Sequence, residues 1–238
     1  MTISVRRQAF VDLTVLVENL ARASASPTGS PELTIVDVRG DAYGHGLLAV
    51  AQALAAAGAT GFLVSRSHDA VALDAVGIHS SVLASALPAQ QRVVGSRLYG
   101  LDPLDAAPCA FRLIGEVIAV KQVPADRGVS YGYTYRTIRP TTLALVALGF
   151  ADGIPRVASN RAPVRIGDFT GRVTGRIAMD QFVVDLDGNT AAVGDEVVLF
   201  GDPTVGDPSV HQWADATGLA AEVILSRLGR RIERVYAQ

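Results

Sequence analysis

The sequence predicts an α/β domain, built as a partial (β/α) barrel, followed by a β domain. Over the first hundred residues, short β-branched runs alternate with alanine-rich helical segments, which is the pattern of βα units around a parallel sheet. From about Phe111 onward, β-branched runs are separated by Gly, Asp and Pro, as in a small sandwich or barrel. The stretch from Pro103 to Pro108 lies at this change. We therefore expect domains at residues 1–105 and 106–238.

Each βα unit is identified from its apolar pattern. The run from Leu33 to Val38 predicts a buried strand, and Leu47 to Ala57 predicts a helix that Gly58 ends. A preceding unit is expected from Ala9 to Ala23, followed by a loop at Ser24 to Pro31. The same criteria predict strands at 62–65 and 81–85 and a helix at 68–76.

The α/β domain is too short for a closed barrel. A (β/α)8 barrel takes roughly 200 residues or more. Only about 105 residues precede the β domain, which is enough for roughly four βα units. An open parallel sheet exposes pairing groups and apolar faces at its edges. Either the partial barrel rearranges into another α/β layer or a second subunit covers it, and we expect a homodimer.

The β domain is expected to end in a short helical region. Strands are predicted at 111–123, 142–148, 164–166, 181–185 and 196–200. Helices are predicted from Val210 to Thr217 and from Ala221 onward, before a last strand at Arg230 to Tyr236.

Composition excludes several classes of function. A net charge of −2 provides no basic excess for neutralising phosphates, so no nucleic-acid partner is expected. Cys109 is the only cysteine, which excludes an internal disulfide and a thiolate metal cluster. No stretch approaches the ~20 apolar residues that span a bilayer, and a cytoplasmic protein is expected. Lys121 is the only lysine, so chemistry that needs a lysine amine has one candidate.

Residues Val38 to Gly46, with the sequence VRGDAYGHG, resemble a signature of the alanine racemase family. In that family a strand ends in a lysine that forms a Schiff base with pyridoxal 5'-phosphate (PLP), and an Ala-Tyr-Gly-His-Gly turn follows. The resemblance implies that Tyr43 contacts the cofactor phosphate. Arg39 takes the place of the lysine, and a guanidinium stays protonated and forms no such imine.

Segments further along are similar to the same family. Val129 to Tyr135 resembles the motif whose tyrosine, here Tyr131, acts as a second acid/base at the partner subunit's cofactor. Gly175 to Gln181 matches a stretch whose Met-Asp pair lies beside the substrate carboxylate, which implies that role for Met179 and Asp180. Two other segments are similar: Leu148 to Arg156, with Phe150 where the family usually has tyrosine, and Gly194 to Gly201.

Gly95 to Gly100 resembles the last barrel strand of the family. Its glycine and next residue, here Gly95 and Ser96, give backbone amides to the phosphate. The arginine that bonds the pyridine nitrogen falls on Val93. The family has roughly four more strands between the positions of Leu87 and Arg92, and a C-terminal tyrosine near the phosphate falls on Arg230. The resemblance therefore implies a truncated, divergent member without covalent PLP.

The candidate residues also have structural interpretations. Arg39 supplies the cation that Tyr131 needs, binds a carboxylate or phosphate bidentately, or forms an ion pair with Asp37 or Asp41. Tyr131 is either a phenol poised for proton transfer, which requires a neighbouring cation, or a buried tyrosine with a satisfied hydroxyl. His45 is expected to maintain the fold. Met179 and Asp180 are either ligand contacts or turn residues.

Three functions follow as hypotheses. The first is a PLP-independent enzyme for a small anionic substrate, with Tyr131 and Arg39 as catalytic residues. Its anion-binding residues are Tyr43, Gly95, Ser96, Met179 and Asp180. The second is a non-catalytic dimeric binding or scaffold protein. The third is a weak racemase that holds PLP noncovalently through Tyr43 and the amides of Gly95 and Ser96.

Overall fold

The computed structural model describes residues 5–24, 34–79, 81–83, 92–105 and 107–237. Its contacts divide the chain into two compact units. The α/β unit comprises Val11–Phe111 with Tyr236–Gln238, and the β unit comprises Met1–Phe10 with Arg112–Val235. The division is not a single cut, because the first strand, β1 (Gln8–Asp12), pairs within the sheet of the β unit.

A four-stranded parallel sheet forms the centre of the α/β unit, in the order β4-β3-β2-β5. Every residue of β2 (Thr34–Asp37) and β3 (Gly61–Val64) is buried, as expected for parallel strands covered on both faces. β5 (Arg92–Val94) pairs with β2 rather than with β4 (Ser81–Leu83), the strand before it in the sequence. In a (β/α) barrel the last strand closes beside the first strand of the barrel, and here β5, the last strand of this sheet, pairs with β2, the first strand of this sheet. The sheet is therefore part of such a barrel, which confirms the predicted fold class.

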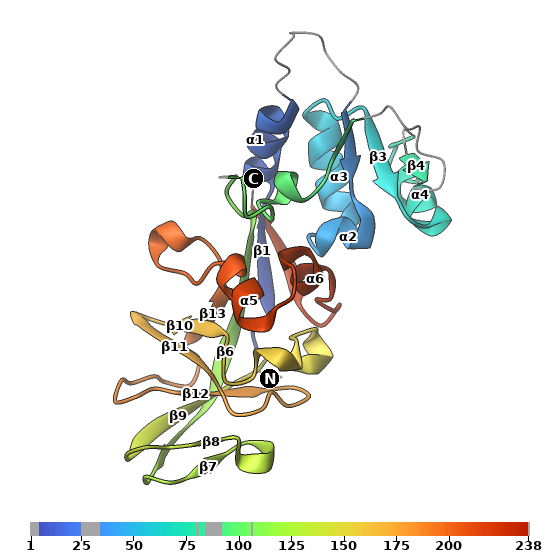
Figure 1. The fold of residues 1–238 in the computed structure, drawn as a ribbon. Helices are drawn as coiled ribbons and strands as arrows, with labels where there is room; N and C mark the ends of the chain where they lie inside the picture. The colour runs from blue at the N-terminus through green and yellow to red at the C-terminus, as the bar shows by residue number, and fades with distance from the viewer. Residues whose placement is uncertain (1–4, 25–33, 80, 84–91, 106, 238) are drawn as a thin grey trace. The chain divides into compact units, whose positions relative to one another are not determined.

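Helices accompany this sheet (Figure 1). α3 (Leu47–Ala56) packs against α1 (Leu13–Ser24) and α4 (Ser67–Asp74). The buried residues of α3 are Val50, Ala51 and Leu54, which follow the helical spacing seen in the sequence.

Two predictions for this unit are wrong in detail. Gly95 to Gly100 is not a strand: β5 ends at Val94, and the 3-10 helix η2 (Ser96–Tyr99) follows, because Tyr99 turns into the core and its hydroxyl donates to the Asp37 carbonyl oxygen at 2.8 Å. The segment from Ala9 is a strand followed by a helix, but β1 joins the other sheet. The expected loop after Ser24 and the junction at 84–91 lie outside the described residues.

The β unit is built around an eight-stranded sheet in the order β13-β10-β11-β12-β9-β6-β1-β14. Additional pairing of β13 with β6 folds the sheet back on itself. Apart from the ends of β1, β6 and β14, its strands lie in this unit. Their bounds are β6 (Phe111–Val123), β9 (Thr141–Val146), β10 (Pro163–Ile166), β11 (Phe169–Thr174), β12 (Phe182–Asp185), β13 (Glu196–Phe200) and β14 (Glu233–Ala237).

Short elements complete the β unit. β7 (Gly128–Val129) and β8 (Tyr135–Arg136) form a small hairpin around the 3-10 turn η3 (Tyr131–Tyr133). The 3-10 turns η4 (Phe150–Asp152), η5 (Arg156–Ala158) and η6 (Pro203–Val205) lie in connections. The predicted C-terminal helices are present as α5 (Val210–Thr217) and α6 (Ala221–Ser226).

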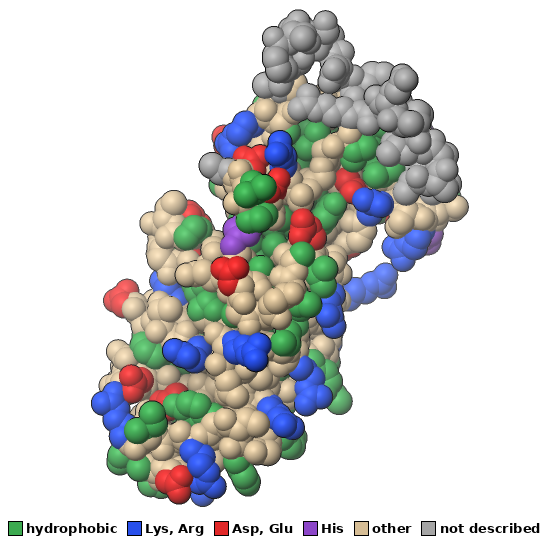
Figure 2. Space-filling model, viewed as in Figure 1, with side chains coloured by type: hydrophobic (Ala, Val, Ile, Leu, Met, Phe, Trp, Pro, Cys, Tyr) green, Lys and Arg blue, Asp and Glu red, His purple; other side chains and the backbone are tan. Residues whose placement is uncertain are grey.

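The charged side chains form no single basic field on the visible face. Figure 2 shows Lys and Arg side chains scattered among Asp and Glu. Within the described ranges, no helix combines the length and apolar character needed to cross a membrane. No three His, Cys, Asp or Glu side chains in the same ranges gather as a metal site requires.

Candidate functional site

The turn after β2 has a left-handed backbone. Gly40, Asp41, Ala42 and Tyr43 have φ values of 62°, 60°, 53° and 54°. Backbone hydrogen bonds close this turn, including Gly44 N–H to the Gly40 carbonyl at 2.9 Å. Consecutive left-handed residues other than glycine each cost roughly 1–2 kcal/mol, so the surrounding contacts must hold this turn in place.

Asp37 is the centre of the contacts that hold the turn. Its carboxylate accepts from Arg39 Nε at 2.9 Å and from Arg39 Nη2 at 2.6 Å. The Tyr43 hydroxyl donates to the same carboxylate at 3.0 Å. The side chain of Asp37 is 3% exposed, whereas that of Arg39 is 46% exposed. We name these three residues the Asp37 cluster.

The contacts with Asp37 keep the Arg39 guanidinium protonated. Hydrogen bonds from the guanidinium to Asp37 raise the pKa of Arg39 above its ordinary value, and the charge of Asp37 adds to this effect. Arg39 is therefore a fixed cation, oriented bidentately by a buried carboxylate. The ion pair with Asp37 that the sequence suggested as one interpretation is formed.

Aromatic rings pack beneath the turn. The ring centroids of Tyr43 and Tyr99 lie 4.8 Å apart, those of His45 and Tyr99 lie 4.7 Å apart, and those of His45 and Phe111 lie 4.9 Å apart. His45 is fully buried, and its Nδ1 lies 2.9 Å from the Ala42 carbonyl oxygen. These contacts fit the expected role of His45 in maintaining the fold. Burial raises the pKa of Tyr99 well above its ordinary value.

Gly95 lies beside the Asp37 cluster. A Cβ atom at Gly95 would stand 3.4 Å from the Tyr43 hydroxyl oxygen and 3.8 Å from Asp37 Oδ2. Gly95 and Ser96 are half-buried where β5 leads into η2. The structure thus places Gly95 beside Tyr43 and Asp37.

Tyr131 is held on an exposed turn of the β unit. Its side chain is 70% exposed, so it is not the buried tyrosine of the structural interpretation. The turn is confined by positive φ values of 58° at Ser130, 71° at Gly132 and 47° at Tyr133. A Cβ atom at Gly132 would lie 3.5 Å from the guanidinium carbon of Arg176, so a cation adjoins this turn.

Met179 and Asp180 also lie on the surface of the β unit. Met179 is 56% exposed. Asp180 pairs with Arg231 at 2.6 Å, and Arg231 reaches the buried Asp152 at 3.1 Å. Asp180 therefore sits at the exposed end of an ion-pair chain that begins inside the unit.

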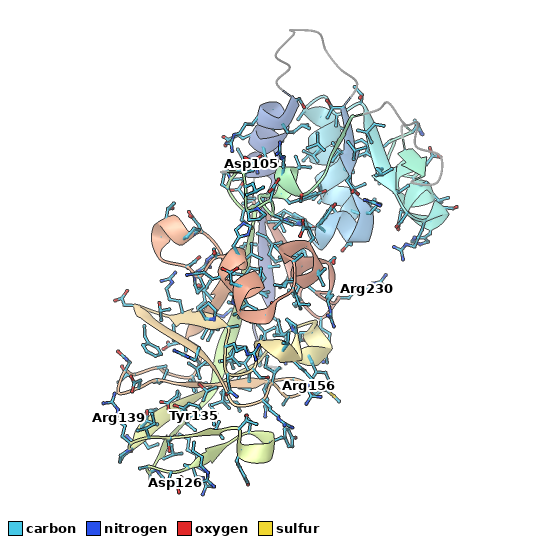
Figure 3. All side chains as sticks on the ribbon, viewed as in Figure 1. Asp105, Asp126, Tyr135, Arg139, Arg156 and Arg230 are labelled. Atoms are coloured by element: carbon cyan, nitrogen blue, oxygen red, sulfur yellow. The ribbon has the colours of Figure 1, made fainter. Side chains whose placement is uncertain are left out.

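Two other sequence candidates lie elsewhere. Lys121 is exposed on β6, and the resemblance places no lysine chemistry there. Arg230 is exposed in the turn between α6 and β14, where Figure 3 labels it.

From the sequence, Asp37 was expected only as a possible ion-pair partner of Arg39. Its signal was present, because a charged residue at the end of an otherwise apolar strand is buried only with partners. Arg176 and Arg231 were not predicted, because surface arginines carry no local pattern that separates them from others.

Two family models match this chain. The alanine racemase N-terminal domain matches residues 11–104, and the alanine racemase C-terminal domain matches residues 110–236. Curated alanine racemases of Thermobifida fusca and Streptomyces coelicolor are 43% and 47% identical over 147 and 150 residues, which is 60% of this chain in each case. The chain spans about two fifths of the length of these relatives, 39% and 38%.

Solved structures agree with the family models. The alanine racemase of D-cycloserine-producing Streptomyces lavendulae superposes with a TM-score of 0.87 at 25% identity, covering 99% of this chain and 98% of that chain. The alanine racemase of Streptomyces coelicolor A3(2) gives a TM-score of 0.82 at 26% identity, with 98% of each chain covered. The chain therefore belongs to the alanine racemase family.

Proposed function

We propose that the protein is a PLP-independent enzyme that acts on a small anionic substrate, with Arg39 binding the anion and Tyr131 transferring a proton. The observation that carries the proposal is the bidentate pair between Arg39 and Asp37 at the end of β2. Imine chemistry needs an amine at that place. A permanently charged guanidinium binds and orients anions instead.

The residues of the Asp37 cluster do not suit PLP. The Tyr43 hydroxyl, which the resemblance assigns to the phosphate, is engaged by Asp37. The Asp37 carboxylate also stands near Gly95, where a phosphate on the backbone amides would meet like charge. We propose that the protein works without PLP, whether covalent or noncovalent.

An anion can still approach Arg39. A guanidinium has five N–H donors, of which two bond to Asp37, while Tyr43 interacts with the same group. Nearly half of the side chain is exposed. Asp37 fixes the direction of the guanidinium and also lowers the net attraction for an anion, so we expect weak binding that favours small carboxylates.

Tyr131 supplies the proton-transfer group in this proposal. Its exposed phenol stands on a confined turn, and the Arg176 guanidinium adjoins the same turn at Gly132. The resemblance implies that this tyrosine serves the partner subunit. We therefore propose a homodimer in which the α/β unit of one copy and Tyr131 of the other form the site.

The test requires no knowledge of the substrate. Small amino and hydroxy carboxylates are incubated with the protein in D2O. Exchange of the hydrogen on the carbon next to the carboxylate for deuterium is followed by NMR. Tyr131→Phe should reduce exchange by about 100-fold or more, the usual range for a general acid/base. Tyr133→Phe, on the same turn and 64% exposed, is the matched control and should keep the activity. Equal exchange in wild type and Tyr131→Phe would exclude the mechanism.

A second candidate is a non-catalytic binding or scaffold protein. It is favoured by the same cluster, because Arg39 and Tyr43 already bond Asp37 and need no ligand. Analytical ultracentrifugation separates the cases together with the exchange assay. A dimer without exchange on any carboxylate supports the scaffold, whereas a monomer without exchange removes the basis for both.

A further inference from the structure

The turn at Met179 is joined to η4 by its backbone. The Phe150 N–H donates to the Ala178 carbonyl oxygen at 3.0 Å, and the Ala151 N–H donates to the Met179 carbonyl oxygen at 2.9 Å. A Cβ atom at Gly149 would overlap the Met179 carbonyl oxygen, so this close approach of the two segments requires glycine. These contacts fix the backbone on one side of the turn.

A buried carboxylate lies at the end of η4. The side chain of Asp152 is fully buried, and its Oδ2 accepts from the Gly149 N–H at 2.8 Å. Arg231 Nε lies 3.1 Å from the other oxygen, Oδ1. Arg7 Nε lies farther from Oδ1, at 3.7 Å, and donates to the Ala147 carbonyl oxygen at 2.9 Å. Because a buried carboxylate requires a cationic partner, Asp152 fixes where the Arg231 guanidinium lies.

The other end of the Arg231 guanidinium reaches the tip of the turn. Its Nη2 lies 2.6 Å from Asp180 Oδ1, and the Asp180 side chain is half-exposed. An isolated surface ion pair contributes little, because two flexible side chains must be ordered together. Here Asp152 has already ordered the guanidinium, so pairing with Asp180 costs less conformational entropy. The pair should therefore hold Asp180 more firmly than an isolated surface pair would.

We propose that Arg231 is a positioning residue, which holds the turn of Met179 and Asp180 in one conformation. This role rests on the proposed function, in which Met179 and Asp180 are among the anion-binding residues. Arg231 also compensates the charge of Asp180, which would otherwise repel a carboxylate at this surface. Arg231 acts through the turn and takes no part in proton transfer.

Met179 provides a direct probe of the turn. The chain has two methionines, Met1 and Met179. In the full chain, grown with methionine that carries a 13C-labelled methyl group, Met179→Leu assigns the Met179 signal by its loss. Because the Met179 side chain is 56% exposed, its methyl signal should report motion of the turn rather than packing in the core.

Variants at both ends of the ion pair test the positioning. Arg231→Gln should shift and narrow the Met179 methyl signal, because the turn gains freedom. Asp180→Ala should have the same effect, although it leaves the pair between Arg231 and Asp152 in place. Arg139→Gln is the matched control, because it breaks an ion pair with an exposed aspartate elsewhere in the β unit (Figure 3) and should leave the signal unchanged.

Titration with acetate separates this role from the proposed function. Acetate should move the Met179 methyl signal of the wild-type chain, and Arg231→Gln should raise the Kd by about 2- to 5-fold, the range of an exposed ion pair. If the signal responds to Arg231→Gln but not to acetate, the positioning by Arg231 stands and anion binding beside Met179 fails.

Three results would overturn the positioning role. They are a Met179 signal that neither Arg231→Gln nor Asp180→Ala changes, an equal change in Arg139→Gln, and an unchanged Kd for acetate in Arg231→Gln. Fluorescence of Trp213, the only tryptophan and buried in the same unit, checks that each variant is folded. If Arg231→Gln does not fold, Asp180→Ala decides the question, because Asp152 keeps its partner in that variant.

Discussion

At the scale of single residues, Asp37 holds the turn after β2 in place. One buried carboxylate orients the Arg39 cation, accepts from the Tyr43 hydroxyl and stands beside the Gly95 turn. The sequence allowed an anion site and an ion pair as alternatives for Arg39. The direction of the Arg39 side chain toward Asp37 decides between these alternatives. That direction depends on the left-handed turn, which no local sequence pattern predicts.

Asp37→Asn should lower the free energy of unfolding by about 1–3 kcal/mol, because it leaves the Arg39 guanidinium without its charged partner. Asp126→Asn is the matched control. It breaks an ion pair with Arg136 in which both side chains are largely exposed, and it should change stability by less than about 0.5 kcal/mol. Urea denaturation measures both values. Equal effects would show that the Asp37 cluster is no more than a surface ion pair.

Tyr135 gives a pH-dependent prediction in the β unit. Burial, with the hydrogen bond to Asp185 at 2.7 Å, raises the pKa of Tyr135 to about 12. The unfolded chain releases this proton near pH 10 and the folded chain near pH 12, so the contribution of Tyr135 to stability is lost as pH rises through this window.

Tyr135→Phe should therefore be less stable than wild type at pH 8, and the difference should narrow at pH 11. Tyr133→Phe, which keeps Tyr135, should leave the alkaline loss of stability in place. Denaturant titrations at both pH values provide the measurement. A constant difference between wild type and Tyr135→Phe would contradict the assigned pKa.

At the scale of elements, regular segments followed from the sequence and irregular ones did not. The strands β6 and β13 and the helix α5 agree with their predicted bounds. α5 begins at a capping box of Ser209 and Gln212, a local signal. The strand β11 was not predicted, because Gly171 interrupts its apolar pattern. The η2 turn and the left-handed turn depend on tertiary contacts of Tyr99 and Asp37.

The left-handed turn is also tied to α3. Asp41 has a φ of 60°, and its Oδ1 accepts from the backbone N–H of Leu47, the first residue of α3, at 2.8 Å. Asp41→Ala removes the acceptor and places a poorly suited residue in the left-handed region, so stability should fall by about 1–2 kcal/mol.

Asp41→Asn is the control for this prediction. Asparagine keeps an oxygen acceptor and tolerates the left-handed region, so its stability should stay close to that of wild type. Thermal or urea unfolding compares the two variants. If both lose stability equally, the charge of Asp41 matters and its hydrogen bond does not.

At the scale of the whole molecule, the fold class followed from the change in apolar pattern along the chain, and the family followed from the order of the motifs. The change from βα units to β-rich runs predicted both parts, and the motifs around Tyr43, Tyr131 and Met179 predicted the family. The contribution of β1 to the β sheet was not predicted, because strand pairing across distant segments leaves no local mark. The proposed pairing of Tyr131 with a second copy stays a prediction for the same reason.

We propose that this family member works without covalent PLP. The direct measurement is intact-mass analysis of the full chain after incubation with PLP and reduction with borohydride, alongside an assay of D- and L-alanine interconversion. We expect an unmodified chain and no racemisation. A pyridoxyl group on Lys121, the only lysine, together with racemisation of alanine, would contradict it.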